Sequence, residues 1–361
     1  MLPCRRGHAA ACLLLVLTLL VILSCVHPAA AARPEPAHGW HSFKRLQDAP
    51  PGSRVTGLGE LKRYLAKFGY MPAGAEHGGE PTDAFDEHLE AALKRYQSRL
   101  SLPITGQLDA VTLDQIMSPR CGVEDDRGVS VSPEHGGAVS RFTFFKGEPR
   151  WKQKSDPIVL TYAMSPTATV SYLLPEDVRA VFLRAFERWA LVIPVSFMET
   201  DDYEEADIKL GFYEGSHGDG VPFDGPLGIL GHAFSPRNGR LHLDASEQWA
   251  LDFADGTETS VAIDLESVAT HEIGHVLGLG HSTSPKAVMY PSIKPLQKKA
   301  DLTVDDVEGV QLLYGSNPDF RLSSLYNEMD TSMSQERSSL VASSAWSVVG
   351  AVLVILLVTQ L

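Results

Sequence analysis

The chain is 361 residues long and acidic: 45 Asp and Glu residues outweigh 31 Lys and Arg residues, which gives a formal net charge of −14. This charge excludes nucleic acid as an expected partner, because no basic tract offers phosphate groups a binding surface. The length suffices for about two domains with appendages.

The N-terminal residues 1–32 have the composition of a secretory signal peptide. Two arginines come first, an apolar run follows at 13–23, and small residues complete the segment at 29–32. An N-terminal membrane anchor is the alternative, but the apolar run is short and the small residues follow it. We therefore expect cleavage near Ala32 and export of the chain.

Residues 33–118 predict a small helical domain, because apolar side chains recur at helical spacing. Two helices are expected before the turn at 105–106 and a third, short one after it, all around one core. The spaced residues are Leu58, Leu61, Tyr64, Leu65 and Phe68, then Phe85, Leu89, Ala92, Leu93 and Tyr96, and finally Leu113 and Ile116.

Residues 119–140 form a loop and linker that hold a single cysteine. Three of the four cysteines lie in the expected signal peptide, so Cys121 has no intramolecular disulfide partner in the exported chain. It stands between Pro119 and Gly122 in an irregular segment. The stretch 126–140, rich in Gly, Ser, Val and charged residues, is typical of an exposed linker that proteases cut readily.

Residues 141–316 predict a larger domain of mixed strands and helices. Short alternating or apolar runs favour strands at 158–162, 195–198, 207–212, 229–234 and 240–244. Helices are expected to begin at Pro175, Leu265 and Thr303.

The composition of residues 317–344 indicates a polar linker, and residues 345–361 form an apolar tail. No basic residue follows the tail, and small residues precede it, among them Ser338, Ser339 and Ala342. This order fits a glycolipid (GPI) anchor signal that is removed. A C-terminal membrane span stays open as the alternative, because the tail is only marginally short for one. Either way we expect tethering at the extracellular face of the plasma membrane.

The chemistry is concentrated in residues 271–281, HEIGHVLGLGH. His271 and His275 lie one turn apart on one helix face, where two imidazoles reach one metal ion. Gly278 lets the chain leave the helix, which brings His281 back as a third ligand. Three histidines with one open position are typical of catalytic zinc, and Glu272 is placed to act as general base on a water.

Cys121 is the natural fourth ligand of this zinc in a latent form. Thiolate binds zinc strongly, and with the thiolate bound no hydroxide forms. A buried structural cysteine is the alternative.

A second group of candidate ligands precedes the helix. His217, Asp219, His232 and His242 would complete a tetrahedral site, which is typical of structural zinc. The carboxylates of Asp224, Asp244 and Glu247 suit calcium, but ordinary turn formation explains them equally well.

With these motifs the chain resembles the matrixins, the matrix metalloproteinase branch of the metzincins, and most closely the short plant-type members without a hemopexin-like domain. Four features carry the resemblance: the zinc motif, Ser282 after it, Met289 in the following turn (the Met-turn), and the cysteine-switch sequence at 119–123. The resemblance implies an α+β fold, with a twisted, mostly parallel five-stranded sheet and three helices. It also implies that the preceding domain is a three-helix, peptidoglycan-binding-like prodomain.

The resemblance also implies site residues. The second group becomes the structural zinc site, and the carboxylates become a calcium site that includes the carbonyls of Gly225, Leu227 and Ile229. Substrate is expected to lie along the edge strand at 229–234. A further calcium site would use Asp207, but Arg240 replaces an acidic ligand there. Ile293 stands in the wall of the specificity pocket, which predicts preference for medium or large apolar side chains.

Together these observations predict a latent, secreted zinc endopeptidase that cleaves extracellular proteins or peptides after activation by another protease or by itself. The alternative hypothesis is a wall-glycan-binding module at 58–117 with a non-catalytic metal domain.

Overall fold

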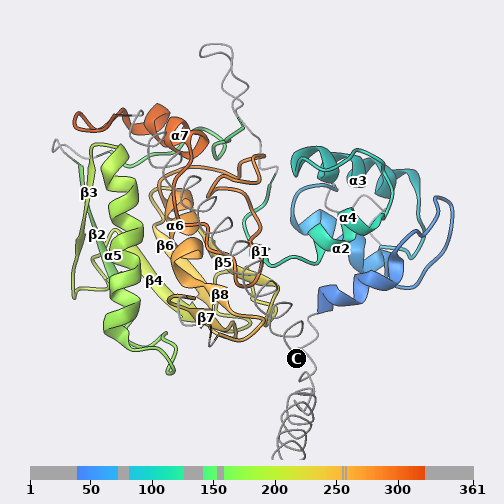
Figure 1. Ribbon diagram of the computed structural model, residues 1–361, viewed down its shortest axis with the longest axis horizontal. Helices are drawn as coiled ribbons and strands as arrows, with labels where there is room; N and C mark the ends of the chain where they lie inside the picture. The colour runs from blue at the N-terminus through green and yellow to red at the C-terminus, as the bar shows by residue number, and fades with distance from the viewer. Residues whose placement is uncertain are drawn as a thin grey trace, which may run out of the picture. The chain divides into compact units, whose positions relative to one another are not determined.

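The computed structural model describes residues 39–71, 81–125, 141–152, 158–253, 256 and 258–321 (Figure 1). The expected signal peptide, the linker after residue 125 and the apolar tail lie outside the described residues. Within the described part of the chain, no helix is both long enough and apolar enough to cross a membrane.

The first described part, residues 39–118, is helical and is called the helical region below. Its elements are the 3₁₀ helix η1 (Gly39–Leu46) and the α-helices α2 (Leu58–Lys67), α3 (Glu87–Arg99) and α4 (Ala110–Ile116). Asp86 and Asp109 cap α3 and α4, because their carboxylates accept hydrogen bonds from the Leu89 and Thr112 amides at 2.8 and 2.9 Å. The three predicted helices are confirmed, and η1 was not predicted.

A mostly parallel sheet organises the second part, residues 141–321, called the sheet region below. Its strands are β2 (Ile158–Met164), β3 (Val195–Glu199), β4 (Ile208–Tyr213), β5 (Ile229–Ala233) and β6 (Arg240–Asp244). With β1 (Arg120–Cys121) at one edge, the order is β1-β5-β6-β4-β2-β3, and β5 runs antiparallel to β6 while the other pairs are parallel. This confirms the predicted five-stranded sheet. The short parallel pair β7 (Trp249–Ala250) and β8 (Ile263–Asp264) was not predicted.

The sixth strand of the sheet, β1 (Arg120–Cys121), comes from the loop that carries the cysteine. It pairs in parallel with β5, so it covers the outer edge of the strand along which substrate was expected to lie. We call residues 119–125 the cysteine loop.

Three helices complete the sheet region: α5 (Pro175–Val192), α6 (Leu265–Val276) and α7 (Val304–Tyr314). Pro175 suits the first turn of α5, which needs no amide donor there. Asp264 caps α6 as the sequence indicates, and Thr303 and Asp306 form a capping box at α7.

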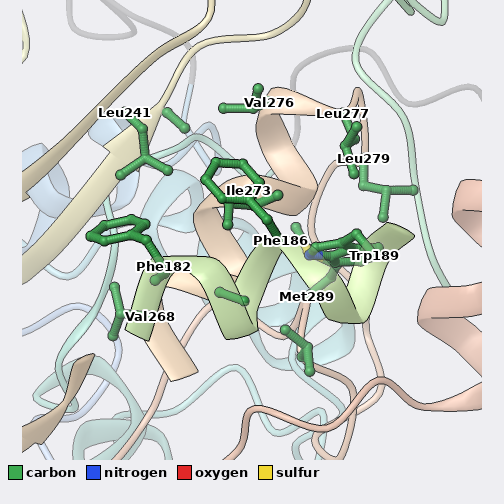
Figure 2. Packing of buried hydrophobic residues seen from close by; sticks show 14 of the residues in the cluster. Phe182, Phe186, Trp189, Leu241, Val268, Ile273, Val276, Leu277, Leu279 and Met289 are labelled. Carbon is green, nitrogen blue, oxygen red and sulfur yellow. The ribbon is translucent and has the colours of Figure 1, made fainter. Parts of the chain in front are cut away.

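The core of the sheet region lies where α5 and α6 pack together. Figure 2 shows Phe182, Phe186 and Trp189 of α5 facing α6, with Ile273 among them and Met289 beside Trp189. The Trp189 indole donates to the Thr270 carbonyl at 2.9 Å. Every residue of α6 is buried. This packing holds the helix that carries the zinc motif rigidly against the sheet.

Candidate metal centre

His271, His275 and His281 converge as their spacing predicts. The first two lie on α6, and Gly278 follows with φ of 109°, a left-handed conformation that a side chain would strain. A Cβ at Gly278 would also overlap the Pro149 carbonyl oxygen. The turn therefore requires glycine, and it returns His281 to the other two histidines.

Four donor atoms surround one point in this cluster. The Cys121 sulfur and one nitrogen from each of the three histidines all lie within 4.8 Å of one another. Cys121 Sγ is 3.4 Å from His275 Nε2, which in turn is 3.2 Å from His281 Nε2. Three imidazoles and one thiol form a donor set that suits tetrahedral zinc.

Hydrogen bonds orient the imidazoles for this role. Nδ1 of His271 donates to the Val288 carbonyl, and Nδ1 of His275 to the Leu279 carbonyl, each at 2.7 Å. Each bond assigns the proton to Nδ1 and leaves the Nε2 lone pair for a metal. Nε2 of His271 is buried and has no hydrogen-bond partner in the described residues. Burial lowers the pKa of both side chains well below the ordinary value, so both are neutral as ligands must be.

Glu272 lies beside this cluster and is fully buried. Among the described residues, neither of its carboxylate oxygens has a hydrogen-bond partner. Burial raises the pKa of Glu272 to about 8, against a smaller lowering by the Cys121 thiol. A carboxyl group with a pKa near neutrality can both accept and return a proton.

The cysteine loop reaches the cluster by backbone pairing on two sides. The Arg120 and Gly122 amides donate to the carbonyls of Gly228 and Gly231 at 2.9 and 2.8 Å, and the Cys121 amide donates to the Pro291 carbonyl at 2.8 Å. The thiol is 4% exposed and its pKa is raised well above the ordinary value, first by burial and then by the nearby Glu272 carboxylate.

Two charged residues of the cysteine loop were not predicted as part of the site. Arg120 is completely buried and donates to Asp125 at 2.7 Å, while its guanidinium lies 3.6 Å from the centre of the Phe68 ring. Asp125 also accepts from Tyr70 at 2.6 Å and from His281 Nδ1 at 2.6 Å. The spacing of these two charged residues along the chain does not predict that they are buried. Only the folded structure shows that they contact the site.

Asp306 is another residue of the site that was not predicted from the sequence. Its buried carboxylate accepts hydrogen bonds from the Val288 and Met289 amides, both at 3.0 Å. It thereby fixes the Met-turn, whose Val288 carbonyl orients His271. Met289 itself is fully buried.

The second predicted ligand group is also assembled. His217 Nε2, His232 Nε2 and His242 Nδ1 lie 2.9, 2.7 and 2.9 Å from one oxygen of Asp219. Burial lowers the pKa of His232 and of His242 to about 4, so both imidazoles are neutral. One carboxylate and three imidazoles leave no open position, as a structural zinc site requires.

The acidic residues form a third candidate site. Asp244 and Glu247 are buried, and each has one carboxylate oxygen without a hydrogen-bond partner in the described part of the chain. Burial, together with Asp244 and Asp224, raises the pKa of Glu247 to about 8. Gly225 and Leu227, which follow Asp224, have φ of 93° and 64°, so the loop that begins at Asp224 is sharply bent. A divalent cation held by oxygens would compensate this cluster of carboxylates.

The residues of the doubted further calcium site are engaged elsewhere. The Asp207 carboxylate accepts from the Thr161 amide at 2.9 Å, and the Arg240 guanidinium lies 4.2 Å from the centre of the Phe234 ring.

A small cavity lies between α6 and the chain after the Met-turn, where the sequence predicts a specificity pocket. Leu230, Val268, Val288 and Ile293 give it apolar walls next to Glu272. Lys299 also lines it, which was not predicted, and its ammonium donates to the Ser292 carbonyl at 3.2 Å.

Comparison with known proteins agrees with this geometry. Residues 150–315 match the family model of the matrixins, and residues 55–116 match a putative peptidoglycan binding domain. The chain is 53% identical over 292 residues to Metalloendoproteinase 1-MMP of Arabidopsis thaliana, an alignment that covers 81% of this chain and 78% of the relative. The chain belongs to the matrixin family.

Two further relatives support the same assignment. Metalloendoproteinase 4-MMP of Arabidopsis thaliana is 56% identical over 74% of this chain and 75% of its own length. Metalloendoproteinase 1 of Glycine max is 43% identical over 87% of this chain and 99% of its own length. This matrixin is accordingly a zinc metalloendopeptidase, and its cofactors are catalytic zinc, structural zinc and calcium.

Proposed function

We propose that this matrixin is made as a latent enzyme in which Cys121 occupies the fourth position of a catalytic zinc held by His271, His275 and His281. The observation that carries the proposal is the position of the Cys121 sulfur, within 4.8 Å of a donor nitrogen of all three histidines and beside Glu272. The helical region then acts as the prodomain. After activation, the position of the thiol is free for water.

Glu272 is the general base in this proposal. When bound, zinc supplies a Lewis acid that polarises the scissile carbonyl and lowers the pKa of water from 15.7 to about 7. The Glu272 carboxylate removes the proton from the attacking water and then delivers it to the leaving amine. Its raised pKa, about 8, supports both steps, since the group can exist in either state near neutrality.

Substrate binding and latency compete for the same strand edge. The cysteine loop pairs with β5. It also contacts the chain after the Met-turn, where the backbones of Arg120 and Ser292 form an antiparallel β-bridge. An extended substrate along β5 needs these backbone groups. We therefore propose that cleavage between residues 126 and 140, by another protease or by the enzyme itself, releases the loop and exposes the edge to extracellular proteins or peptides.

Contacts of the helical region favour this inhibitory role over glycan binding. Its apolar core continues into the sheet region through Phe223, Ile229 and Tyr290. Ser101 also donates to the Thr283 carbonyl at 2.7 Å, and Gln115 to the Ser292 hydroxyl at 2.9 Å. These contacts hold the helical region against the side of the sheet region that carries the catalytic residues.

The other two sites are proposed to hold metals that stabilise the fold. We assign structural zinc to His217, Asp219, His232 and His242, because three imidazoles already surround one carboxylate oxygen. We assign calcium to the Asp224, Asp244 and Glu247 carboxylates with the carbonyls of Gly225, Leu227 and Ile229. Export through a signal peptide at 1–32 and a GPI anchor replacing the tail at 345–361 complete the proposal, on the composition of those segments.

Glu272→Gln tests the catalytic assignment. The amide cannot accept the proton, so cleavage of a peptide library by the activated chain should be lost while the zinc content stays unchanged. Glu308→Gln, an exposed position on α7, is the matched control and should retain full turnover. Turnover that survives Glu272→Gln would contradict the role of Glu272.

Cys121→Ser tests latency. Without the bond between the thiolate and zinc, the cysteine loop should leave β5 for part of the time, so the uncleaved Cys121→Ser chain should hydrolyse peptides that the uncleaved native chain leaves intact. If the variant stays inactive until the linker is cut, although peptides can enter the site, the thiol is not the inhibitory ligand.

A further inference from the structure

The three zinc-ligand histidines are not held by the same part of the chain. The Nδ1 donors of His271 and His275 bond to the Val288 and Leu279 carbonyls, both within the sheet region. His281 Nδ1 instead bonds to Asp125 of the cysteine loop at 2.6 Å. Only this histidine therefore depends for its ring orientation on a residue that activation removes.

The backbone of His281 is held from the helical region as well. Its carbonyl accepts a hydrogen bond from Arg99 of α3 at 2.9 Å and one from Thr143 of the sheet region at 2.7 Å. His281 lies after the Gly278 turn, outside the helix that fixes the other two ligands. Contacts from outside α6 consequently decide where its imidazole points.

Asp125 is rigid enough to orient a ring. It is 2% exposed, its amide donates to the Phe68 carbonyl at 3.2 Å, and its carboxylate accepts from Arg120 and Tyr70 as well as from His281. Three donors leave the carboxylate little freedom.

We propose that Asp125 is a positioning residue for His281, so that the cysteine loop completes the zinc site as well as blocking it. A carboxylate that accepts the Nδ1 proton of a metal-bound histidine fixes its tautomer and increases its basicity as a ligand, and losing such a partner commonly weakens metal binding by about 10–100-fold. The proposal rests on the assignment of catalytic zinc to the three histidines. It implies that the latent chain binds this zinc more tightly than the processed enzyme does, beyond the contribution of the thiol.

The test measures zinc affinity of the full chain by competition with a chromophoric chelator. All variants carry Cys121→Ser, so that the thiol makes no contribution. Asp125→Asn should weaken zinc binding at the catalytic site about 10–100-fold. Tyr70→Phe is the matched control: it removes another hydrogen bond to the same carboxylate but leaves its charge and its contact with His281, so zinc affinity should stay within about threefold of the parent chain.

A spectroscopic signal separates positioning from mere folding. In the ¹⁵N-labelled, zinc-loaded chain, the His281 Nδ1 proton should resonate far downfield because it lies in a short bond to a carboxylate. Asp125→Asn should move this signal upfield, whereas Tyr70→Phe should not. Unchanged zinc affinity and an unmoved signal in Asp125→Asn would overturn the proposal.

Loss of Asp125 also leaves Arg120 without its buried partner, which can release the loop. Labelling of Cys121 in the thiol-containing version of each variant reports this. If Asp125→Asn releases the loop, zinc affinity is measured instead in the double variant Arg120→Met/Asp125→Asn. This variant also removes the unpaired charge of Arg120. Weak zinc binding with the loop bound supports the proposal, and native affinity in that state overturns it.

The outcome is independent of the latency proposal. If Cys121→Ser alone leaves zinc affinity unchanged, the thiol is not a ligand and the proposed latency fails. The effect of Asp125 is measured within the serine background and is read separately.

Discussion

Replacing Arg120 by methionine should loosen the cysteine loop by a predictable amount. Arg120 is completely buried and Asp125 is 2% exposed, so their ion pair has almost no contact with water. Removing one partner of such a pair typically costs about 3–5 kcal/mol, because the remaining charge stays buried. Asp125 keeps Tyr70 and His281 as hydrogen-bond donors, so the lower end, about 3 kcal/mol, applies.

The assay is the rate at which a thiol reagent modifies Cys121 in the uncleaved chain. Cys121 is 4% exposed, so the loop must open before the reagent reaches the sulfur. When the loop recloses faster than the reagent reacts, the rate follows the opening equilibrium. A cost of about 3 kcal/mol then increases the rate about 100-fold, since about 1.4 kcal/mol corresponds to a factor of ten.

A surface ion pair provides the matched control. Lys94 and Glu90, one turn apart on α3, are paired at 2.6 Å but both are largely exposed. Exposed helix pairs of this kind contribute about 0.3–0.5 kcal/mol, so Lys94→Met should change the labelling rate less than about threefold. If Arg120→Met labels within threefold of the native chain while its circular dichroism is unchanged, the buried pair does not hold the loop.

Two further predictions concern the metal sites. In Gly274→Ala the new Cβ would overlap the Met289 sulfur, so the free energy of unfolding, measured by thermal unfolding, should fall by about 1–3 kcal/mol. An unchanged melting temperature would show that Met289 moves aside at no cost. Removal of calcium should destabilise the chain more at pH 8 than at pH 5. The pKa of Glu247 rises from the ordinary 4.5 to about 8 on folding, so the calcium-free chain loses stability as the pH increases through that window, and Asp244 acts in the same direction. Melting with and without calcium at both pH values measures this, and equal calcium stabilisation at both would contradict it.

Local patterns in the sequence were sufficient for most of the fold and for the donor atoms of the catalytic site. The four-residue separation of His271 and His275 places both on one face of α6 whatever surrounds the helix, and Gly278 permits the turn that returns His281. Apolar spacing likewise predicted α5 and the three helices of the helical region. Helix periodicity and the backbone freedom of glycine are short-range properties, so the sequence determines them directly.

The resemblance added what spacing alone left open. The carboxylates of Asp244 and Glu247 were as consistent with turns as with calcium, because an acidic residue in a loop has the same sequence signature in both cases. Burial favours calcium over turns: both side chains are inside the protein with unsatisfied oxygens among the described residues. Burial depends on the packing of the whole sheet region and cannot be read from neighbouring residues.

The sequence predicted Cys121 as the fourth donor, but only the tertiary structure decided the other contacts of the histidines. Cys121 and His275 are 154 residues apart, and Asp125 and His281 are 156 apart, yet each pair is in direct contact. The Asp306 side chain holds the Met-turn, and the Arg120 side chain stabilises Asp125. The spacing of these residues along the chain does not predict either contact. The sequence by itself determined which donor atoms share α6 and its following turn. Pairing of the cysteine loop with β5 decided that a thiol and a carboxylate from a distant segment join them, because contacts between remote residues depend on how the helices and the sheet pack.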